Sequence, residues 1–413
     1  MRAEIIATGT ELLLGQIVNT NARFLAEKLA EKGIDVYWQT VVGDNPERLE
    51  EAFRLALSRA DLVLASGGLG PTMDDLTKET LAKVLGLPLE PHPGWQEYLE
   101  QLFARPGFRK MPASNRKQAM LPRGARLIAN ENGTAPGVWV EKDGKIVVLM
   151  PGPPRELEPM FIKHVMPMLP ETGSIIMSRV LKVTGLGESL MEELVADLVR
   201  TQSNPTIAPL AKQNETHLRI SAKAGSREEC LRLLAATEEK LLARLGDYVF
   251  ARDDETMEEV VARLLVAKKY TLAAAESCTG GLLAHTLTNV PGSSAYFLLG
   301  LVTYSNAAKE KLLRVPAALL AEEGAVSEVV AKTMAQNARE LAQSTLGVGI
   351  TGIAGPDGGT PEKPVGLVYI GLATPEGVRV KRFNFFGKRE NIKERAVHAA
   401  LNMIRLYLIR QTG

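Results

Sequence analysis

A serine and a lysine in the last third of the chain have the types and positions needed for amide or ester hydrolysis. Ser277 lies in AESCTGG, directly after a small apolar stretch, and Lys309 lies in VTYSNAAKEKLL, after the next apolar stretch. A buried lysine with a lowered pKa can act as the base that activates a serine nucleophile. Tyr304 stands at the end of the second apolar stretch and can relay the proton or orient the ammonium. The pattern therefore indicates a Ser–Lys hydrolase site.

The turn after Ser277 permits other interpretations. Serine is a preferred N-cap, so Ser277 can instead cap the helix predicted to follow. Cys278 is an alternative nucleophile, but a thiol beside an apolar strand more often packs in a core. If Ser277 attacks, the backbone N–H groups of Cys278, Thr279 and Gly280 would form the oxyanion hole. Lys311 lies on another face of the predicted helix and serves as a control.

Three further polar residues of this region lie in turns or at a helix start. Ser294 is in PGSS, Thr351 is in ITGIAGPDGGT, and Arg389 is in FGKRENIKERA, near a predicted helix start. Hydroxyls, backbone amides and a guanidinium are groups that bind a phosphate or a carboxamide. We therefore expect these residues to contact a substrate.

A second candidate site lies in the first 160 residues, in loops that follow predicted strands. The loops are ATGTELLLGQIVNTN, SGGLGPTMDDLTKET and MPGPPRELEPM. Ligands of open α/β sheets bind beyond the carboxyl ends of the strands. The first loop supplies Gly9 and Glu11, and the third supplies Glu156. We expect all three loops to meet at one site.

The middle loop combines phosphate-binding and acidic features. Gly68 and Gly70 let backbone N–H groups approach an anion, and Thr72 is predicted to cap a following helix whose N-terminus favours phosphate. Asp74 and Asp75 would repel a phosphate unless a divalent cation lies between them. The alternative is that the two carboxylates only complement the helix dipole.

The elements that must position these residues form three blocks. Residues 1–170 alternate strands and helices, with a hairpin in GVWVEKDGKIVVLMPG, which predicts a mixed sheet covered on both faces. Residues 171–250 read β-α-β-β-α, the order of a small α+β module that links or assembles the others. Residues 251–413 return to α/β alternation and end in a long helix. The fold class is therefore α/β, with two α/β domains joined by a small module.

The composition is that of a soluble globular protein. The chain has 413 residues, 45% hydrophobic and 23% charged, with a net charge of +1. This charge gives no general attraction to nucleic acid or to an anionic membrane. The two cysteines suggest no disulfide framework, and the first residues lack a signal-peptide pattern. We expect a cytoplasmic protein.

The motifs GTELLLGQ, GGLGPTMDDLT and MPGPPRE together resemble the molybdopterin-binding fold of the competence/damage-inducible CinA family. The pattern around Leu69 and Pro71 fits the CinA branch better than the molybdopterin enzymes. The resemblance implies an ADP-ribose pyrophosphatase that needs a divalent metal ion such as Mg²⁺, with K⁺ as a further candidate cofactor. The metal ligands would be Asp74, Asp75 and Glu156. The substrate contacts would be Gly9, Glu11, Gly68, Gly70 and Thr72.

The motifs AESCTGG, VTYSNAAKEKLL and GITGIAGPDGGTPEKPVG closely resemble the CinA C-terminal domain over nearly all of residues 255–410. The resemblance implies a nicotinamide mononucleotide deamidase that needs no cofactor. Ser277 would be the nucleophile, Lys309 its general base and Tyr304 an assisting group. The substrate contacts would be Cys278, Thr279, Gly280, Ser294, Thr351 and Arg389. The middle module would be the family's KH-like domain.

The whole resemblance implies a bifunctional hydrolase of pyridine-nucleotide recycling. Its partners would be the small nucleotides nicotinamide mononucleotide and ADP-ribose, with a second copy of the chain in a homodimer, and without nucleic acid or membrane. Two alternatives stay open. One is a molybdopterin-handling enzyme, and the other is a non-catalytic partner of competence or recombination proteins. The presence of both Ser277 and Lys309 argues against the second alternative.

Overall fold

The computed structural model describes residues 1–104, 111–212 and 214–411 of the chain. The chain forms two compact units, one of residues 1–177 with 221–233 and the other of residues 178–220 with 234–413. Both units combine helices with sheets, which confirms the predicted α/β fold class. The predicted middle module, residues 171–250, is shared between the two units.

The first unit contains a six-stranded mixed sheet in the order β2-β1-β3-β8-β7-β6. Strands β2, β1, β3 and β8 are parallel, whereas β7 and β6 are antiparallel to their neighbours. The predicted hairpin is the β7–β8 connection, where Asp143 and Gly144 have φ values of 52° and 72°, as a two-residue hairpin turn requires. The strands are β1 (Arg2–Thr8), β2 (Asp35–Val42), β3 (Leu62–Ser66), β6 (Arg126–Ile128), β7 (Gly137–Lys142) and β8 (Lys145–Met150).

Helices cover both faces of this sheet. Leu25 and Leu157 belong to the core on one face, and Phe53 and Leu81 belong to the core on the other. Asn45 caps α3, because its Oδ1 accepts a hydrogen bond from the Arg48 N–H at 2.9 Å. The helices are α1 (Thr10–Leu13), α2 (Thr20–Glu31), α3 (Pro46–Arg59), α4 (Thr77–Leu85), α5 (Pro93–Phe103) and α6 (Pro154–Met160). Shorter segments are β4 (Leu89–Pro91), η1 (Ala113–Ala119), β5 (Met120–Pro122), η2 (Phe161–Val165) and η3 (Met166–Met168).

A four-stranded sheet in the order β10-β11-β9-β12 follows. Its elements occur in the predicted order β-α-β-β-α, with one more strand at the end. They are β9 (Ile175–Val183), α7 (Glu188–Arg200), β10 (Thr206–Ala211), β11 (Thr216–Ala224), α8 (Arg227–Leu245), η4 (Gly246–Tyr248) and β12 (Val249–Arg252).

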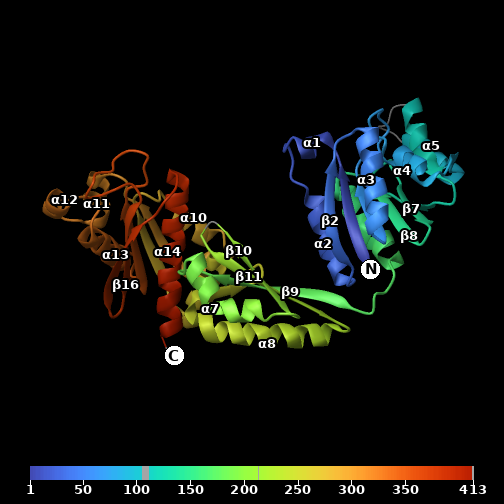
Figure 1. Cartoon of the computed structure of the whole chain (residues 1–413). Coiled ribbons are helices and arrows are strands. Elements are labelled where there is room, and N and C mark those ends of the chain that lie inside the picture. The colour runs from blue at the N-terminus through green and yellow to red at the C-terminus, as the bar shows by residue number, and fades with distance from the viewer. Residues whose placement is uncertain (105–110, 213, 412–413) are drawn as a thin grey trace. The chain divides into compact units, whose positions relative to one another are not determined.

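The second unit contains a five-stranded sheet in the order β14-β13-β15-β16-β17. Strand β13 is parallel to both β14 and β15, and the last two strands form an antiparallel hairpin. Figure 1 shows α13 and α14 on opposite faces of this sheet. α13 packs directly on glycine backbone, since a Cβ at Gly349 would lie 2.5 Å from the Ala331 carbonyl oxygen.

The elements of this sheet and its helices extend from residue 257 to residue 410. The strands are β13 (Leu272–Glu276), β14 (Phe297–Val302), β15 (Leu346–Gly352), β16 (Leu367–Thr374) and β17 (Gly377–Asn384). The helices are α9 (Met257–Lys268), α10 (Leu282–Thr288), η5 (Ser293–Ala295), α11 (Asn306–Leu313), α12 (Ala317–Glu323), α13 (Glu328–Ala342) and α14 (Arg389–Arg410).

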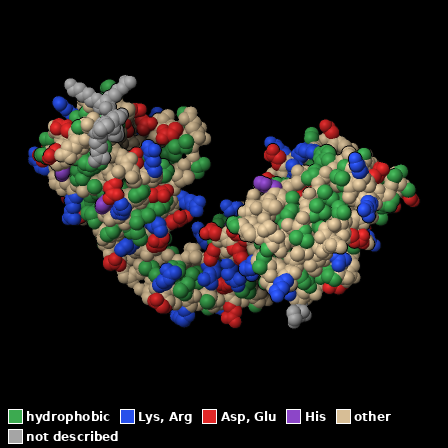
Figure 2. All heavy atoms as spheres, turned by 180° about the vertical axis from the view of Figure 1, so that it is seen from behind, with side chains coloured by type: hydrophobic (Ala, Val, Ile, Leu, Met, Phe, Trp, Pro, Cys, Tyr) green, Lys and Arg blue, Asp and Glu red, His purple; other side chains and the backbone are tan. Residues whose placement is uncertain are grey.

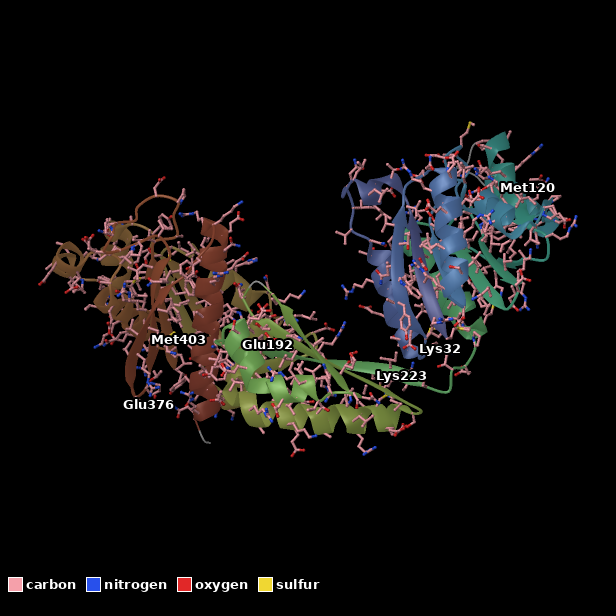
Figure 3. All side chains as sticks on the ribbon, in the orientation of Figure 1. Lys32, Met120, Glu192, Lys223, Glu376 and Met403 are labelled. Atoms are coloured by element: carbon pink, nitrogen blue, oxygen red, sulfur yellow. The ribbon has the colours of Figure 1, made fainter. Side chains whose placement is uncertain are left out.

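Helix α14 is fixed at its far end by the β16–β17 turn. Glu376 lies in that turn, and Met403 lies on α14 (Figure 3). The Tyr407 hydroxyl donates a hydrogen bond to the Glu376 carboxylate at 2.8 Å. This contact fixes the last turns of α14, and the buried face of the helix, from Ile392 to Leu408, packs it on the sheet.

The surface carries charges of both signs. On the face shown in Figure 2, acidic and basic side chains are interspersed, in agreement with the net charge of +1. Across the described ranges, none of the helices combines the length and apolar character that crossing a bilayer demands.

Candidate active site

The carboxyl edge of the five-stranded sheet brings Ser277 and Lys309 together. Ser277 directly follows β13, and Lys309 is on α11, just after the neighbouring parallel strand β14. The two strands end in register, with Glu276 opposite Val302. The Thr303 N–H donates to the Glu276 carbonyl at 2.7 Å, which continues the pairing past the strand ends. Both predicted reacting groups therefore leave the sheet at the same point.

Lys309 is buried with its amine against the serine. Its Nζ donates to Ser277 Oγ at 3.0 Å and to the Thr303 carbonyl at 2.8 Å. Lys309 is 1% exposed and Ser277 is 8% exposed. Burial lowers the pKa of Lys309 from its ordinary value of 10.5, and the nearby Cys278 opposes this only in part. A lowered pKa favours the neutral amine, which is the form that can accept a proton.

The residue that caps the next helix is Glu276, not Ser277. α10 begins at Leu282, and Glu276, 1% exposed, reaches its first turn from the end of β13. The Glu276 carboxylate accepts three backbone hydrogen bonds, from Gly281 at 3.1 Å, Leu283 at 3.0 Å and Ala284 at 2.8 Å. The alternative in which Ser277 is the cap is therefore wrong, and the serine hydroxyl stays available for reaction.

Two of the three predicted oxyanion donors remain available. The Gly280 N–H donates to the Ser277 carbonyl at 3.1 Å, so the prediction that Gly280 is a donor is corrected. For Cys278 and Thr279, no backbone acceptor is paired with the N–H among the described residues. The hydroxyl of Thr279, which is fully buried, also has no partner in the described part of the chain.

The Cys278 side chain is unsuited to nucleophilic attack. It is 6% exposed and belongs to the hydrophobic core under the sheet. Burial raises the pKa of its thiol to about 12. Because the thiolate is the nucleophilic form, a thiol with this pKa is inert near neutral pH. The geometry favours Ser277 as the attacking group.

Tyr304 pairs with Arg389 and not with the lysine. Arg389 donates to the Tyr304 hydroxyl at 2.6 Å and to the Gly355 carbonyl at 2.5 Å. Tyr304 is 58% exposed. Within the described residues, Tyr304 has no hydrogen bond to Lys309 or Ser277, so the predicted relay is not formed directly. The pair instead places a guanidinium and a phenol at the open side of the site.

Two predicted substrate contacts are corrected by their positions. Ser294 lies in η5, before β14, and so at the amino edge of the sheet, opposite to the edge that carries Ser277. The six residues of β14 separate these edges by roughly 20 Å at about 3.3 Å per residue. Thr351 is fully buried on β15, and its hydroxyl donates to the Ala325 carbonyl at 2.6 Å. Neither hydroxyl can contact a substrate at Ser277 within one chain.

The predicted residues of the N-terminal site, apart from Thr72, line one cavity of about 390 Å³. The cavity lies beyond the carboxyl ends of β1, β3 and β8, as expected for an open α/β sheet. Its lining includes Gly9, Gly68 and Gly70. It also includes five carboxylates, from Glu11, Asp44, Asp74, Asp75 and Glu156. No lysine, arginine or histidine is among the described residues that line it.

Thr72 belongs to the turn beside the cavity and not to the helix cap. α4 begins at Thr77, with Leu76 in the N-cap position. Asp75 accepts a hydrogen bond from the Thr72 N–H at 2.9 Å and another from its hydroxyl. A Cβ at Gly70 would lie 2.4 Å from the same carboxylate, so a side chain at this position would displace Asp75. The prediction that Thr72 caps the helix is corrected.

The three predicted metal ligands line the cavity but do not form a complete coordination site. Asp75 is bound to Thr72, and Glu156 accepts a hydrogen bond from Asn130 Nδ2 at 2.8 Å. The described ranges contain no group of three His, Cys, Asp or Glu side chains placed to hold a metal ion. Mg²⁺ is often held by one or two carboxylates together with substrate phosphates. The carboxylates of the lining are of the ligand type that Mg²⁺ prefers.

Three residues of the two sites were not predicted. Glu276 stands in the quoted AESCTGG motif, and a carboxylate at the end of an apolar strand was a signal for a buried cap. Asp44 follows β2 and accepts hydrogen bonds from the Thr10 N–H at 2.9 Å and hydroxyl at 2.7 Å. Thr8 lines the acidic cavity, and its buried hydroxyl has no partner among the described residues. Such an atom is a position for a ligand hydrogen bond.

Three family models match successive parts of the chain. Residues 4–171 match the probable molybdopterin binding domain, residues 178–251 match the damage-inducible protein CinA KH domain, and residues 254–408 match the CinA C-terminal domain. The fold and the matched domains define a multidomain α/β protein with a molybdopterin-binding-like domain and a CinA C-terminal domain.

Two relatives match this chain over nearly its full length. A competence-damage inducible protein of Caldanaerobacter subterraneus subsp. tengcongensis is 53% identical over 409 residues, covering 99% of this chain and 98% of the relative. One of Moorella thermoacetica is 54% identical over 407 residues, covering 98% of each. The solved structure of the protein CinA from Thermoplasma acidophilum is 36% identical, with a TM-score of 0.39, and covers 41% of this chain and 98% of that chain. The chain belongs to the CinA family.

Proposed function

We propose that the C-terminal domain hydrolyses the carboxamide of nicotinamide mononucleotide to nicotinic acid mononucleotide and ammonia. The observation that carries the proposal is the 3.0 Å contact between Lys309 Nζ and Ser277 Oγ in a buried setting. The substrate is the one that the family resemblance implies. Cations suited to its phosphate lie near, since Arg389 borders the site and a Cβ at Gly280 would lie 3.9 Å from Lys393 Nζ.

The first half of the reaction transfers the acyl group to the serine. Neutral Lys309 takes the proton of the Ser277 hydroxyl as Oγ forms a bond to the carboxamide carbon. The negative charge that develops on the carbonyl oxygen is stabilised by the N–H groups of Cys278 and Thr279. The protonated lysine then gives its proton to the amide nitrogen, the C–N bond breaks, and ammonia leaves. The product of this half is an ester between the nicotinoyl group and Ser277.

The second half returns the enzyme to its starting state. A water molecule gives a proton to neutral Lys309 and attacks the ester carbon. The same two N–H groups stabilise the second oxyanion. The lysine returns the proton to Ser277 Oγ as the ester bond breaks, and nicotinic acid mononucleotide leaves. Each half uses one base and the same two donors, so the pair of Ser277 and Lys309 is sufficient for the proton transfers.

An assay of both products tests this proposal. Purified protein is incubated with nicotinamide mononucleotide, and ammonia and nicotinic acid mononucleotide are measured. The proposal predicts that the two products form in equal amounts. The Ser277→Ala variant should form neither product above the uncatalysed level. Equal activity in wild type and Ser277→Ala would contradict the proposal.

The acidic cavity supports a second proposed activity, the hydrolysis of ADP-ribose to AMP and ribose 5-phosphate by the N-terminal domain. The supporting observation is five carboxylates around glycine-rich turns, with no basic side chain among the described lining residues. A pyrophosphate carries negative charge, so it would enter this cavity only with cations that offset the repulsion. Asp74, Asp75 and Glu156 would hold a divalent ion such as Mg²⁺, which would polarise the phosphoryl oxygens. K⁺ is a further candidate.

The alternatives separate in simple assays. Incubation with ADP-ribose in the presence and absence of Mg²⁺ tests the pyrophosphatase directly. Binding of molybdopterin without cleavage of ADP-ribose would favour a molybdopterin-handling role for the N-terminal domain. A protein inactive on both nucleotides would favour a non-catalytic role in competence. We also propose that the chain forms a homodimer, and light scattering would test this by measuring the molecular mass in solution.

A further inference from the structure

Glu276 connects the two segments that carry the reacting groups. Its carbonyl accepts the Thr303 N–H at 2.7 Å, and the Thr303 carbonyl accepts Lys309 Nζ at 2.8 Å. Its carboxylate reaches in the other direction, to the N–H groups of Gly281, Leu283 and Ala284. One buried residue thus contacts the segment before the lysine and the turn after the serine.

We propose that Glu276 is a positioning residue that holds the Cys278 and Thr279 N–H groups where the oxyanion forms. The inference rests on the proposed deamidase function and adds a residue to its machinery. Glu276 does not touch the substrate. It acts by fixing the backbone of the turn from Ser277 to Gly281.

The turn has little conformational preference of its own. Gly280 and Gly281 have φ values of 64° and 93°, and glycine loses more conformational freedom on folding than other residues. The N-cap residue of α10, Gly281, has no side chain with which to cap the helix. The carboxylate therefore supplies the restraint, because it joins the end of β13 to the first turn of α10. Oxyanion donors contribute to the rate only when they are fixed before the reaction begins.

The same carboxylate also stabilises the fold, so the test must separate stability from catalysis. Thr256 is a matched control in the same domain. It caps α9, where the Thr256 N–H donates to the Glu259 carboxylate at 2.8 Å and the Thr256 hydroxyl accepts the Glu259 N–H at 3.4 Å. It has no part in the proposed reaction.

The experiment compares Glu276→Gln and Thr256→Ala with wild type. Glutamine keeps the size and one acceptor oxygen, but it turns an N–H₂ group toward backbone N–H donors. We expect kcat for nicotinamide mononucleotide to fall about tenfold to hundredfold in Glu276→Gln, with KM within about twofold, because fixed donors act on the transition state. Thr256→Ala should lower the melting temperature and leave kcat unchanged.

A second readout does not depend on the substrate. A fluorophosphonate probe reacts with activated serines, and its rate of labelling at Ser277 should fall in Glu276→Gln and not in Thr256→Ala. If wild type is labelled but does not deamidate nicotinamide mononucleotide, the proposed function fails while the labelling rates still test Glu276. If Glu276→Gln kept the kcat and the labelling rate of wild type, the inference would be overturned. Equal decreases of kcat and labelling rate in Glu276→Gln and Thr256→Ala would also overturn it. Wild-type protein that is neither active nor labelled would overturn both proposals.

Discussion

Lys309 Nζ lies 3.0 Å from Ser277 Oγ, at the point where two parallel strands end side by side. The lysine reaches this point from α11 and is 1% exposed. Its remaining hydrogen bond goes to a backbone carbonyl and not to a carboxylate. An uncompensated buried amine is costly to charge, and this cost favours the neutral amine that the proposed mechanism requires.

The pH dependence of deamidation should report this lowered pKa. The reaction needs neutral Lys309, and the lysine is protonated below its pKa, so kcat/KM should rise with pH on a limb below the ordinary value of 10.5. The rate should be measured between about pH 6 and pH 9, because enzymes shift the pKa of a general base toward this range. The Cys278→Ala variant should show the same limb. A kcat/KM that falls as the pH rises would contradict the assignment of Lys309 as the base.

Replacement of Lys309 by methionine should remove activity without unfolding the domain. Methionine fills a similar volume and carries no charge, so the melting temperature at pH 7 should match or exceed that of wild type. Loss of the base should reduce kcat by about a hundredfold to ten-thousandfold. Lys311→Met is the matched control, because Lys311 is exposed on the same helix. Comparable losses in both variants would show that the effect is not specific to Lys309.

The thiol next to the serine should be dispensable. Burial raises the pKa of Cys278 to about 12, so Cys278→Ala should keep most of the deamidase activity. Labelling of the native protein with iodoacetamide at pH 7 should be slow at this position for the same reason. Activity lost in Cys278→Ala and retained in Ser277→Ala would make the thiol the nucleophile.

The acidic cavity should make ADP-ribose cleavage depend on added cation. Asp74→Asn should weaken the response to Mg²⁺, because the substitution removes one of the negative charges that line the cavity. The measured quantity is the rate of AMP formation against Mg²⁺ concentration. Deamidation of nicotinamide mononucleotide by the same variant is the control and should be unchanged. A chelator that left AMP formation intact would rule out the cation.

The placement of many site residues was predictable from the sequence, because parallel strands place their carboxyl ends at one edge of a sheet. The apolar stretches before Ser277 and Lys309 became β13 and β14, and their adjacency explains the contact. The same rule brought Gly9, Gly68 and Glu156 to one cavity.

The corrections concern residues whose partners depend on turn geometry or strand direction. Ser294 stands after a helix and before a strand, so it lies at the amino edge of the sheet. Thr72 and Ser277 are both suited to caps by type, but Leu76 and Gly281 hold the N-cap positions of α4 and α10. Glu276 was not predicted because its capping partners become neighbours only when the turn folds back on the strand end.

The most direct test of the account is to trap the covalent intermediate. Wild-type protein is mixed with nicotinamide mononucleotide, quenched with acid within the first turnover, digested and examined by mass spectrometry. The account predicts the mass of a nicotinoyl mononucleotide ester on the peptide that contains Ser277, absent in Ser277→Ala and present in Cys278→Ala. An adduct on Cys278, or full turnover by Ser277→Ala without any adduct, would contradict it.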